Sequence, residues 1–368
     1  MLSVIALALL VTPQGSGLYG ASPDRPERTM VEVRGVAFGA SGDEHGPIGG
    51  GAGYSARPTR RDHIAHTVDQ LLAALQEAKT GEVVFVPGKV SLDFSARVYV
   101  DKTVLEISEG VTLASDRGTD GSPGALLFSD ALATRPFIRT MGPNVRLSGL
   151  RLRGPDPERR LDHHRRSYRE PGKGRDPKYY YSFPISNGIA ATHDGLEVDN
   201  CELAGWSHAA IYLRRGSKHH IHHSFIHHNQ YQGLGYGVCH DIAESLIERN
   251  LFDFNRHSIA GTGRPGSGYE ARHNVERGTS LSHLFDMHGG RDRKDGTTIA
   301  GDWLHVHHNA FFCTKPVIKI RGIPVKQAVI ERNWLIHPAS RHAMKSDGRT
   351  TFGENAWGIE HPVVRTGR

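Results

Sequence analysis

The stretch Ile247-Glu-Arg-Asn250-Leu-Phe252 decides the fold, because its pattern recurs along the chain. In each copy, apolar residues flank a polar bend residue that is usually asparagine. This bend position falls at residues 200, 224, 250, 274, 309, 333 and 355, in steps of 24, 26, 24, 35, 24 and 22 residues. Repeats of this length are typical of a parallel β-helix, in which each coil stacks on the one before it.

The asparagines have a structural explanation. Asparagine tolerates a left-handed backbone and hydrogen-bonds nearby backbone groups, which suits a tight bend between two strands. Stacked asparagine side chains can also bond to one another along a ladder. We therefore expect the repeated asparagines to form the bends and to take no part in chemistry.

A second strand follows each bend, and its side chains alternate between two faces. One face is apolar, as in Ile259, Phe285 and Ile318, and is expected to enter the core. Because neighbouring coils lie about 4.8 Å apart, the other face is expected to form a compact charged patch across three coils. The residues of this patch are Asp286, His288, Lys319, Arg321, Lys345 and Asp347.

An amphipathic segment precedes the first strands. Thr67 and Gln70 have capping-box spacing, and Val68, Leu71 and Leu75 share one face of the predicted helix. A helix at this place can cover the open end of a solenoid, which otherwise exposes an apolar core and unpaired strand edges.

These patterns predict the domain organisation. Residues 1–21 contain the apolar run Leu2–Val11 and are expected to be a signal peptide, so the protein is expected to be secreted, to the periplasm or the medium. Residues 22–64 are expected to form a loose leader, residues 65–358 the β-helix and catalytic domain, and residues 359–368 a tail. A basic insertion is expected at about residues 154–187.

Composition restricts the partners. The chain has 45 Lys and Arg against 39 Asp and Glu, a net charge of +6, which weakly favours an acidic partner. The 154–187 insertion is basic and aromatic, and Tyr181 within it is expected to stack on sugar rings in a groove for an anionic polysaccharide. No nucleic-acid motif or membrane span is recognised, so neither partner is expected, and the chain is expected to be a monomer. The 3 Cys fit neither a disulfide framework nor a zinc site.

The repeat over residues 65–358 resembles the pectate-lyase-like superfamily, which implies an all-β, right-handed parallel β-helix. Within it, His283-Leu-Phe-Asp286-Met-His288 resembles the Tyr-Gly-Phe-Asp-Pro-His motif of alginate C5-epimerases, which share lyase-like proton abstraction. The match implies that Asp286 and His288 are active-site residues. His283 stands where that family has tyrosine, and Met287 where it has proline.

A uronate lyase needs cations to neutralise the carboxylate, a base for the C5 proton and an acid for the leaving oxygen. The candidates for the base are His288 and His257, and Tyr236 is the candidate acid, although its strand parity points inward. The substrate-binding candidates are Arg256, His283, Lys319, Arg321, Lys345 and Tyr181. The predicted function is thus β-elimination of an alginate-type polyuronate by a secreted lyase.

Several alternatives remain open from the sequence. They are a uronate C5-epimerase, a glycoside hydrolase using Asp286 and Asp347, a non-catalytic glycan-binding β-helix and a metal-handling protein with 24 His. No metal ligand set is predicted and no cofactor is expected. The resemblance nevertheless allows Ca²⁺, for which Asp292 and Asp295 are the acids beside the patch.

Overall fold

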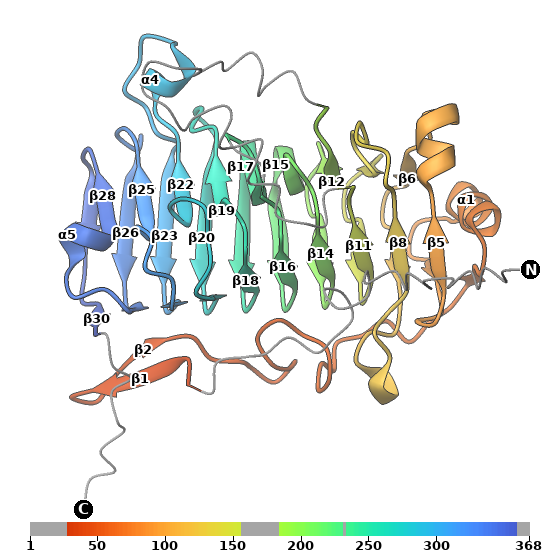
Figure 1. The fold of residues 1–368 in the computed structure, drawn as a ribbon, viewed down its shortest axis with the longest axis horizontal. Helices are drawn as coiled ribbons and strands as arrows, with labels where there is room; N and C mark the ends of the chain where they lie inside the picture. The colour runs from red at the N-terminus through yellow and green to blue at the C-terminus, as the bar shows by residue number, and fades with distance from the viewer. Residues whose placement is uncertain (1–27, 156–183, 231–232, 359–368) are drawn as a thin grey trace, which may run out of the picture.

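The computed structural model describes residues 28–155, 184–230 and 233–358. Parallel strands stack along one axis into an elongated solenoid, and successive coils lie side by side (Figure 1). Each complete coil contributes a strand to each of three faces. The architecture is therefore the parallel β-helix that the repeat predicts.

The first face carries the candidate site. Its strands are β6 (Leu105–Ile107), β9 (Ile138–Thr140), β12 (Asn187–Ala191), the beginning of β15 (Ala209–His222), the beginning of β17 (Tyr236–Glu248), β19 (His257–Gly261), β22 (Phe285–Met287), β25 (Ile318–Ile320) and β28 (Met344–Ser346). Because β15 and β17 continue around a corner, the first and second faces form one sheet of 18 strands.

The second face follows the first around this corner. Its strands are β3 (His63–Ile64), β4 (Val83–Phe85), β7 (Thr112–Ala114), β10 (Arg146–Ser148), β13 (Glu197–Asp199), the ends of β15 and β17, β20 (Gly268–Arg272), β23 (Trp303–His307), β26 (Gln327–Glu331) and β29 (Thr350–Phe352).

The third face is a separate sheet of 10 strands. Its strands are β5 (Ser91–Asp93), β8 (Leu126–Phe128), β11 (Arg151–Arg153), β14 (Glu202–Ala204), β16 (Phe225–His227), β18 (Leu251–Asp253), β21 (Val275–Glu276), β24 (Ala310–Phe311), β27 (Trp334–Leu335) and β30 (Ala356–Trp357).

The core lies inside the solenoid, as the strand alternation predicts. On the first face, Ile259, Phe285 and Ile318 are in register on successive coils and at most 1% exposed. Each extra coil buries another such layer against its neighbours, so the apolar core grows in length with the solenoid.

The bends confirm the asparagine ladder and correct its geometry. Asn250 Nδ2 donates to Asn274 Oδ1 at 3.1 Å, and Asn274 Nδ2 donates to Asn309 Oδ1 at 3.0 Å. The left-handed residue, however, is the one before the ladder position at 224, 250, 274, 309 and 333, as at Arg249 with φ 52°. Asn200 differs, because it is itself left-handed at φ 54° while Cys201 fills the ladder position beside Ser224.

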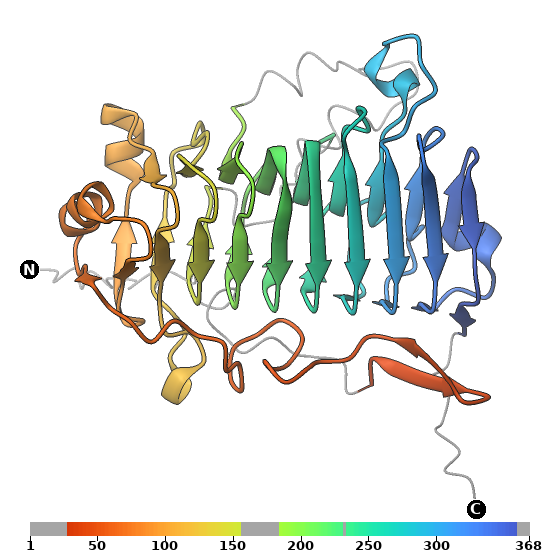
Figure 2. The same ribbon diagram turned by 180° about the vertical axis from the view of Figure 1, so that it is seen from behind.

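The predicted N-terminal helix is α1 (Val68–Glu77), and it covers one end of the solenoid (Figures 1 and 2). Thr67 caps it by accepting a hydrogen bond from the Gln70 amide at 3.2 Å. The Gln70 side chain reaches back to the His66 amide at 2.8 Å, one residue earlier than a capping box requires. Leu71 and Leu75 are buried in the solenoid core.

The described part of the 22–64 segment is packed, in contrast to the expected loose leader. β1 (Met30–Val33) and β2 (Val36–Gly39) form an antiparallel hairpin beside the third face (Figure 2). Val31 and Phe38 are each 5% exposed, in a cluster with Leu251 and Trp334. The sequence signal for the hairpin is an apolar residue at the buried position of each of these two short strands.

Short helical segments complete the described structure. They are η1 (Arg97–Asp101), η2 (Thr119–Gly121), α4 (Gly290–Arg293) and α5 (Ser340–Ala343). Within the described ranges, no helix has the length and apolar character needed to cross a bilayer. The predicted signal peptide, most of the 154–187 insertion and the tail lie outside the described residues.

Candidate active site

The outer side of the first face brings the predicted charged residues together. Asp286 on β22 is in register with Lys319 on β25, which is in register with Lys345 on β28. Arg321 and His288 extend the same outward-facing rows. The patch predicted from strand parity is therefore present across three successive coils.

Asp286 is the centre of this patch and is fully buried. Its two oxygens lie 3.0 Å from His283 Nε2 and 2.8 Å from His288 Nε2. Arg321 donates to both oxygens, through Nε at 3.1 Å and Nη2 at 2.9 Å. Burial alone would raise the pKa of Asp286, but the close contacts of its oxygens with the His283 and His288 rings outweigh it and hold this pKa well below its usual value. The carboxylate is thus an ionised anchor for the surrounding rings.

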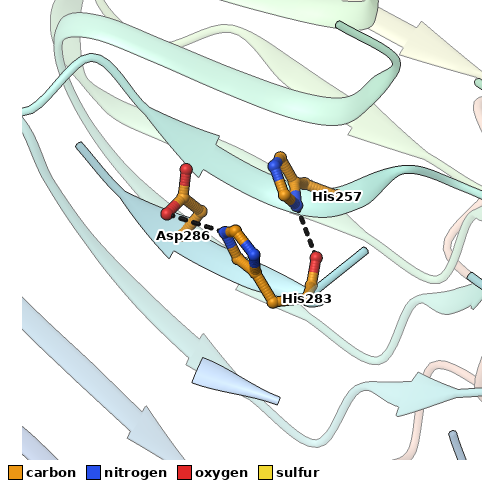
Figure 3. A group of neighbouring side chains, drawn as sticks. All are labelled: His257, His283 and Asp286. Atoms are coloured by element: carbon orange, nitrogen blue, oxygen red, sulfur yellow. Dashed lines mark hydrogen bonds and ion pairs between the residues drawn. The ribbon is translucent and has the colours of Figure 1, made fainter. Parts of the chain in front are cut away.

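His257 and His283 lie beneath the surface, next to Asp286 (Figure 3). Their ring centroids are 4.0 Å apart, and His257 Nδ1 is hydrogen-bonded to the His283 carbonyl oxygen. Since that bond requires a proton on Nδ1, Nε2 of His257 carries the lone pair, and no described residue bonds to it. Burial lowers the pKa of His257 well below its usual value, so the ring is neutral.

Tyr236 continues the aromatic stack one coil earlier. It is in register with His257, and the two rings stack with centroids 5.7 Å apart. Tyr236 is 6% exposed and its hydroxyl donates to the Gly233 carbonyl at 3.1 Å. The inward parity expected from the sequence is wrong: Tyr236 packs on the outer side of the first face with Ala209, Cys239 and Ala260, while Gly237 faces the core. The phenol is thus held in the wall of the site. Arg256 lies over the Tyr236 ring at 5.9 Å.

Two predicted roles change with this geometry. His257, fully buried, cannot contact a polymer as its base, and Tyr236 is tied to backbone and does not present its hydroxyl as an acid. His288 differs from both, because its side chain is 26% exposed while Nε2 remains on Asp286. Among the predicted catalytic histidines, it is the one that a substrate can reach.

A pocket of about 180 Å³ opens beside the buried carboxylate, lined by Lys319, Arg321, Lys345 and Asp347 among others. Arg321 is already committed, because it pairs with Asp286 and also with Asp292 at 2.9 Å. Within the described ranges, no ion pair joins Lys319 or Lys345 to an acid. These two ammonium groups, rather than Arg321, are therefore available to an anionic ligand.

Other predicted groups fall outside this centre. Tyr181 lies in residues that the structure does not describe. Asp347 lines the pocket two coils from Asp286, whose carboxylate is inaccessible, so the pair does not provide the two reachable acids of a glycoside hydrolase. No sequence pattern pairs Asp292 with Arg321, because that contact depends on how the loop around α4 folds back.

Calcium does not fit the acids that were considered for it. Asp292 pairs with Arg321 at 2.9 Å and accepts a hydrogen bond from the Gly289 amide at 3.2 Å. Asp295 pairs with Arg293 at 2.7 Å. Since arginine already neutralises each carboxylate, the two residues do not form a Ca²⁺ ligand set.

Comparison with known proteins places the fold. No family model matches the sequence, and no curated protein matches it. The crystal structure of the alginate lyase from Paenibacillus sp. str. FPU-7 is similar at a TM-score of 0.50 and 13% identity, over 82% of this chain and 98% of the lyase. The chain is a right-handed parallel β-helix. The family 28 exopolygalacturonase of Yersinia enterocolitica is also similar, at a TM-score of 0.50 and 13% identity, over 83% of this chain and 69% of that enzyme. At such low identity the similarity establishes the fold alone, and the activity has to be inferred from the residues of the candidate site.

Proposed function

We propose that this β-helix is a secreted lyase that cleaves an anionic, uronate-containing polysaccharide of the alginate type by β-elimination. The observation that carries the proposal is a partly exposed histidine, His288, held at 2.8 Å by the buried, ionised Asp286 beside a pocket with two free ammonium groups. This arrangement supplies a base and a carboxylate-binding surface on one face. The similar fold of an alginate lyase supports the choice of substrate class.

The chemistry follows from the tautomer that Asp286 selects. With Nε2–H donated to Asp286, His288 keeps a lone pair on Nδ1 that can take the proton from C5 of a uronate. Lys319 and Lys345 bind the uronate carboxylate and stabilise the negative charge that develops next to C5. The C5–H and C4–O bonds break and a C4–C5 double bond forms. Protonated His288 then returns its proton to the leaving oxygen.

The test is to incubate the full chain with polymannuronate, polyguluronate, polygalacturonate and a neutral glucan. We expect ultraviolet absorbance from unsaturated sugar ends with at least one polyuronate and none with the glucan. Replacing His288 with alanine should lower turnover by about 10²–10⁴-fold, as is typical for a lost acid–base group. His342→Ala, an exposed residue outside the pocket, is the matched control and should keep full activity.

A C5-epimerase is the second candidate, favoured by the motif around Asp286 and by the same proton abstraction. It would exchange the C5 hydrogen with solvent without producing unsaturated ends. Solvent deuterium incorporation at C5 without absorbance would therefore replace the lyase with an epimerase. If no polyuronate produces either ultraviolet absorbance or hydrogen exchange at C5, both assignments are refuted.

A further inference from the structure

The outer side of the second face carries the same constellation of side chains twice. In each copy, a His-X-His pair on one strand lies between a glutamate from the preceding coil and a glutamate from the following coil. The N-terminal His–Glu cluster is Glu197, His220, His222 and Glu248, on β13, β15 and β17. The C-terminal His–Glu cluster is Glu270, His305, His307 and Glu331, on β20, β23 and β26.

The two clusters match in their contacts as well as in their residues. The second histidine reaches the preceding glutamate, with Nε2–O distances of 3.3 Å for His222–Glu197 and 3.1 Å for His307–Glu270. The first histidine reaches the following glutamate, at 2.8 Å for His220–Glu248 and 3.3 Å for His305–Glu331. In both copies the two imidazole rings are adjacent, with centroids 4.0 Å apart and stacked in the N-terminal cluster, and 4.1 Å apart and tilted by 33° in the C-terminal cluster.

The spacing within the C-terminal cluster suits a metal ion. Zn²⁺ binds imidazole nitrogen and carboxylate oxygen at about 2.0–2.2 Å, so neighbouring ligand atoms in a tetrahedral site are roughly 3.3 Å apart. The His305–Glu331 and His307–Glu270 distances, 3.3 Å and 3.1 Å, are close to this value. One ligand atom each from Glu270, His305 and His307 already lies within 4.8 Å of the others.

Arginine distinguishes the two clusters. In the N-terminal cluster, Arg146 pairs with Glu197 at 3.3 Å, and Glu248 is held by both Arg249 and Arg272. Those guanidinium groups neutralise both carboxylates and would repel a cation.

In the C-terminal cluster, Arg272 pairs with Glu270 at 3.1 Å, and no described arginine pairs with Glu331. The side chains of His305 and Glu331 are 37% and 38% exposed, which leaves an entry for an ion. The C-terminal cluster thus retains negative charge and access, whereas the N-terminal cluster is neutralised.

We propose that the C-terminal His–Glu cluster binds one divalent transition-metal ion, Zn²⁺ or a metal of similar preference, through Glu270, His305 and His307, whose ligand atoms already converge. Glu331, which contacts His305 at 3.3 Å, would turn in as the fourth ligand. The ligands come from three successive strands of the second face, so the ion cross-links three coils. The site lies on a different face from Asp286 and His288 and does not depend on the proposed lyase activity.

Zinc titration of the chelator-treated full chain by calorimetry, in competition with a chelator of known affinity, tests the site. We expect one high-affinity equivalent. Glu331→Gln and His305→Ala should each weaken binding at least tenfold. The double variant His220→Ala/His222→Ala, which removes the matched pair from the N-terminal cluster, should bind zinc as the unaltered chain does.

The visible absorption of bound Co²⁺ provides a second measurement, which distinguishes this site from weak metal binding by exposed histidines. Co²⁺ in a four-coordinate protein site absorbs visible light strongly, and this spectrum should disappear in Glu331→Gln. Because that side chain is exposed, the variant is expected to fold even where a histidine variant does not. Absence of tight zinc binding, or its loss in the His220/His222 variant rather than in Glu331→Gln, would overturn the assignment.

Discussion

The outer sides of the first and second faces use histidine and carboxylate in opposite ways. On the first face a single carboxylate, Asp286, is fully buried and holds His283, His288 and Arg321 around it. On the second face, glutamates such as Glu270 and Glu331 are 29% and 38% exposed, and each pairs with a histidine on a neighbouring coil.

On the first face some charged side chains remain available to a ligand, whereas on the second face most charged side chains pair with one another. On the first face the buried Asp286 pairs with rings and with Arg321, and no acid among the described residues pairs with Lys319 or Lys345 on the next coils, which leaves these two lysines to a ligand. Where acids and bases alternate from coil to coil, they pair along the stack, and the metal site proposed above lies where this pairing is weakest, at the exposed Glu331 that no described arginine neutralises. A charged outer face on a solenoid therefore becomes a candidate site where the pairing is incomplete.

The largest expected effect tests whether Asp286 is the anchor. Replacing it with alanine leaves Arg321 and the two histidines without their shared acceptor in a buried place. Removing one partner of a buried ion pair typically costs about 3–5 kcal/mol. We expect a loss of this size in the free energy of unfolding measured by urea denaturation. A loss below about 1 kcal/mol would show that the two faces are held together in the same way.

Between the two faces lies His240 on β17, which contacts no carboxylate among the described residues. It is fully buried, with Nδ1 donating to the Ala260 carbonyl at 3.1 Å and Nε2 accepting from Ser245 at 2.6 Å. Burial lowers the pKa of His240 from 6.5 to about 4. Below pH 6.5 the unfolded chain therefore binds a proton that the folded chain does not, and the free energy of unfolding falls until about pH 4.

The shift from 6.5 to about 4 corresponds to on the order of 3 kcal/mol, at about 1.4 kcal/mol per pKa unit. Urea denaturation at a series of pH values should show a decline to which His240 contributes this amount, and His240→Gln, which stays neutral, should make the slope shallower by that share, since other buried histidines such as His208 and His223 have the same shift. His342→Ala is the control, because the exposed ring has no such burial. An unchanged slope in His240→Gln would assign the acid sensitivity to other buried histidines.

Much of this contrast follows from the sequence, because strand alternation and coil length place Asp286, His288, Lys319 and Lys345 on one outward surface. The sequence does not show how deeply each of these side chains is buried. Asp286 has outward parity yet is fully buried, because His283, His288 and Arg321 close over it. That closure comes from side-chain directions at the strand ends, which periodicity does not specify.

The stacking of Tyr236 on His257 could not be predicted from the sequence for a related reason. The register between β17 and β19 places the two rings in a stack, and this register depends on where β17 begins. The Gly-rich approach to Tyr236 gives no periodic signal for that start. The two His-X-His pairs, by contrast, can be read directly in the sequence, at His220 and His222 and at His305 and His307, but their glutamate partners come from other coils.

A smaller effect tests whether Lys319 is the free cation of the first face. Replacing it with alanine should lower kcat/KM on the best polyuronate by roughly 10–100-fold, because a hydrogen bond to a charged group is worth about 1.5–3 kcal/mol. Lys326→Ala, an exposed lysine outside the pocket, should leave kcat/KM unchanged. Equal losses in both variants would indicate general attraction to the polymer and no specific contact.

The smallest effect is expected on the second face. Glu331 is 38% exposed and its partner His305 is 37% exposed, so water screens the pair and its contribution is small. Exposed pairs are typically worth about 0–1 kcal/mol, and Glu331→Ala should lower the free energy of unfolding of the metal-free chain by no more than this. Added zinc should then distinguish the unaltered chain from Glu331→Ala. A ligand at 100 times its dissociation constant stabilises the folded state by about 2.7 kcal/mol, and a tenfold weaker site at the same concentration by about 1.4 kcal/mol, so zinc should raise the melting temperature of Glu331→Ala by no more than about half as much as that of the unaltered chain. If Glu331→Ala instead costs as much without metal as Asp286→Ala, the exposed pairs of the second face are as stabilising as the buried anchor of the first.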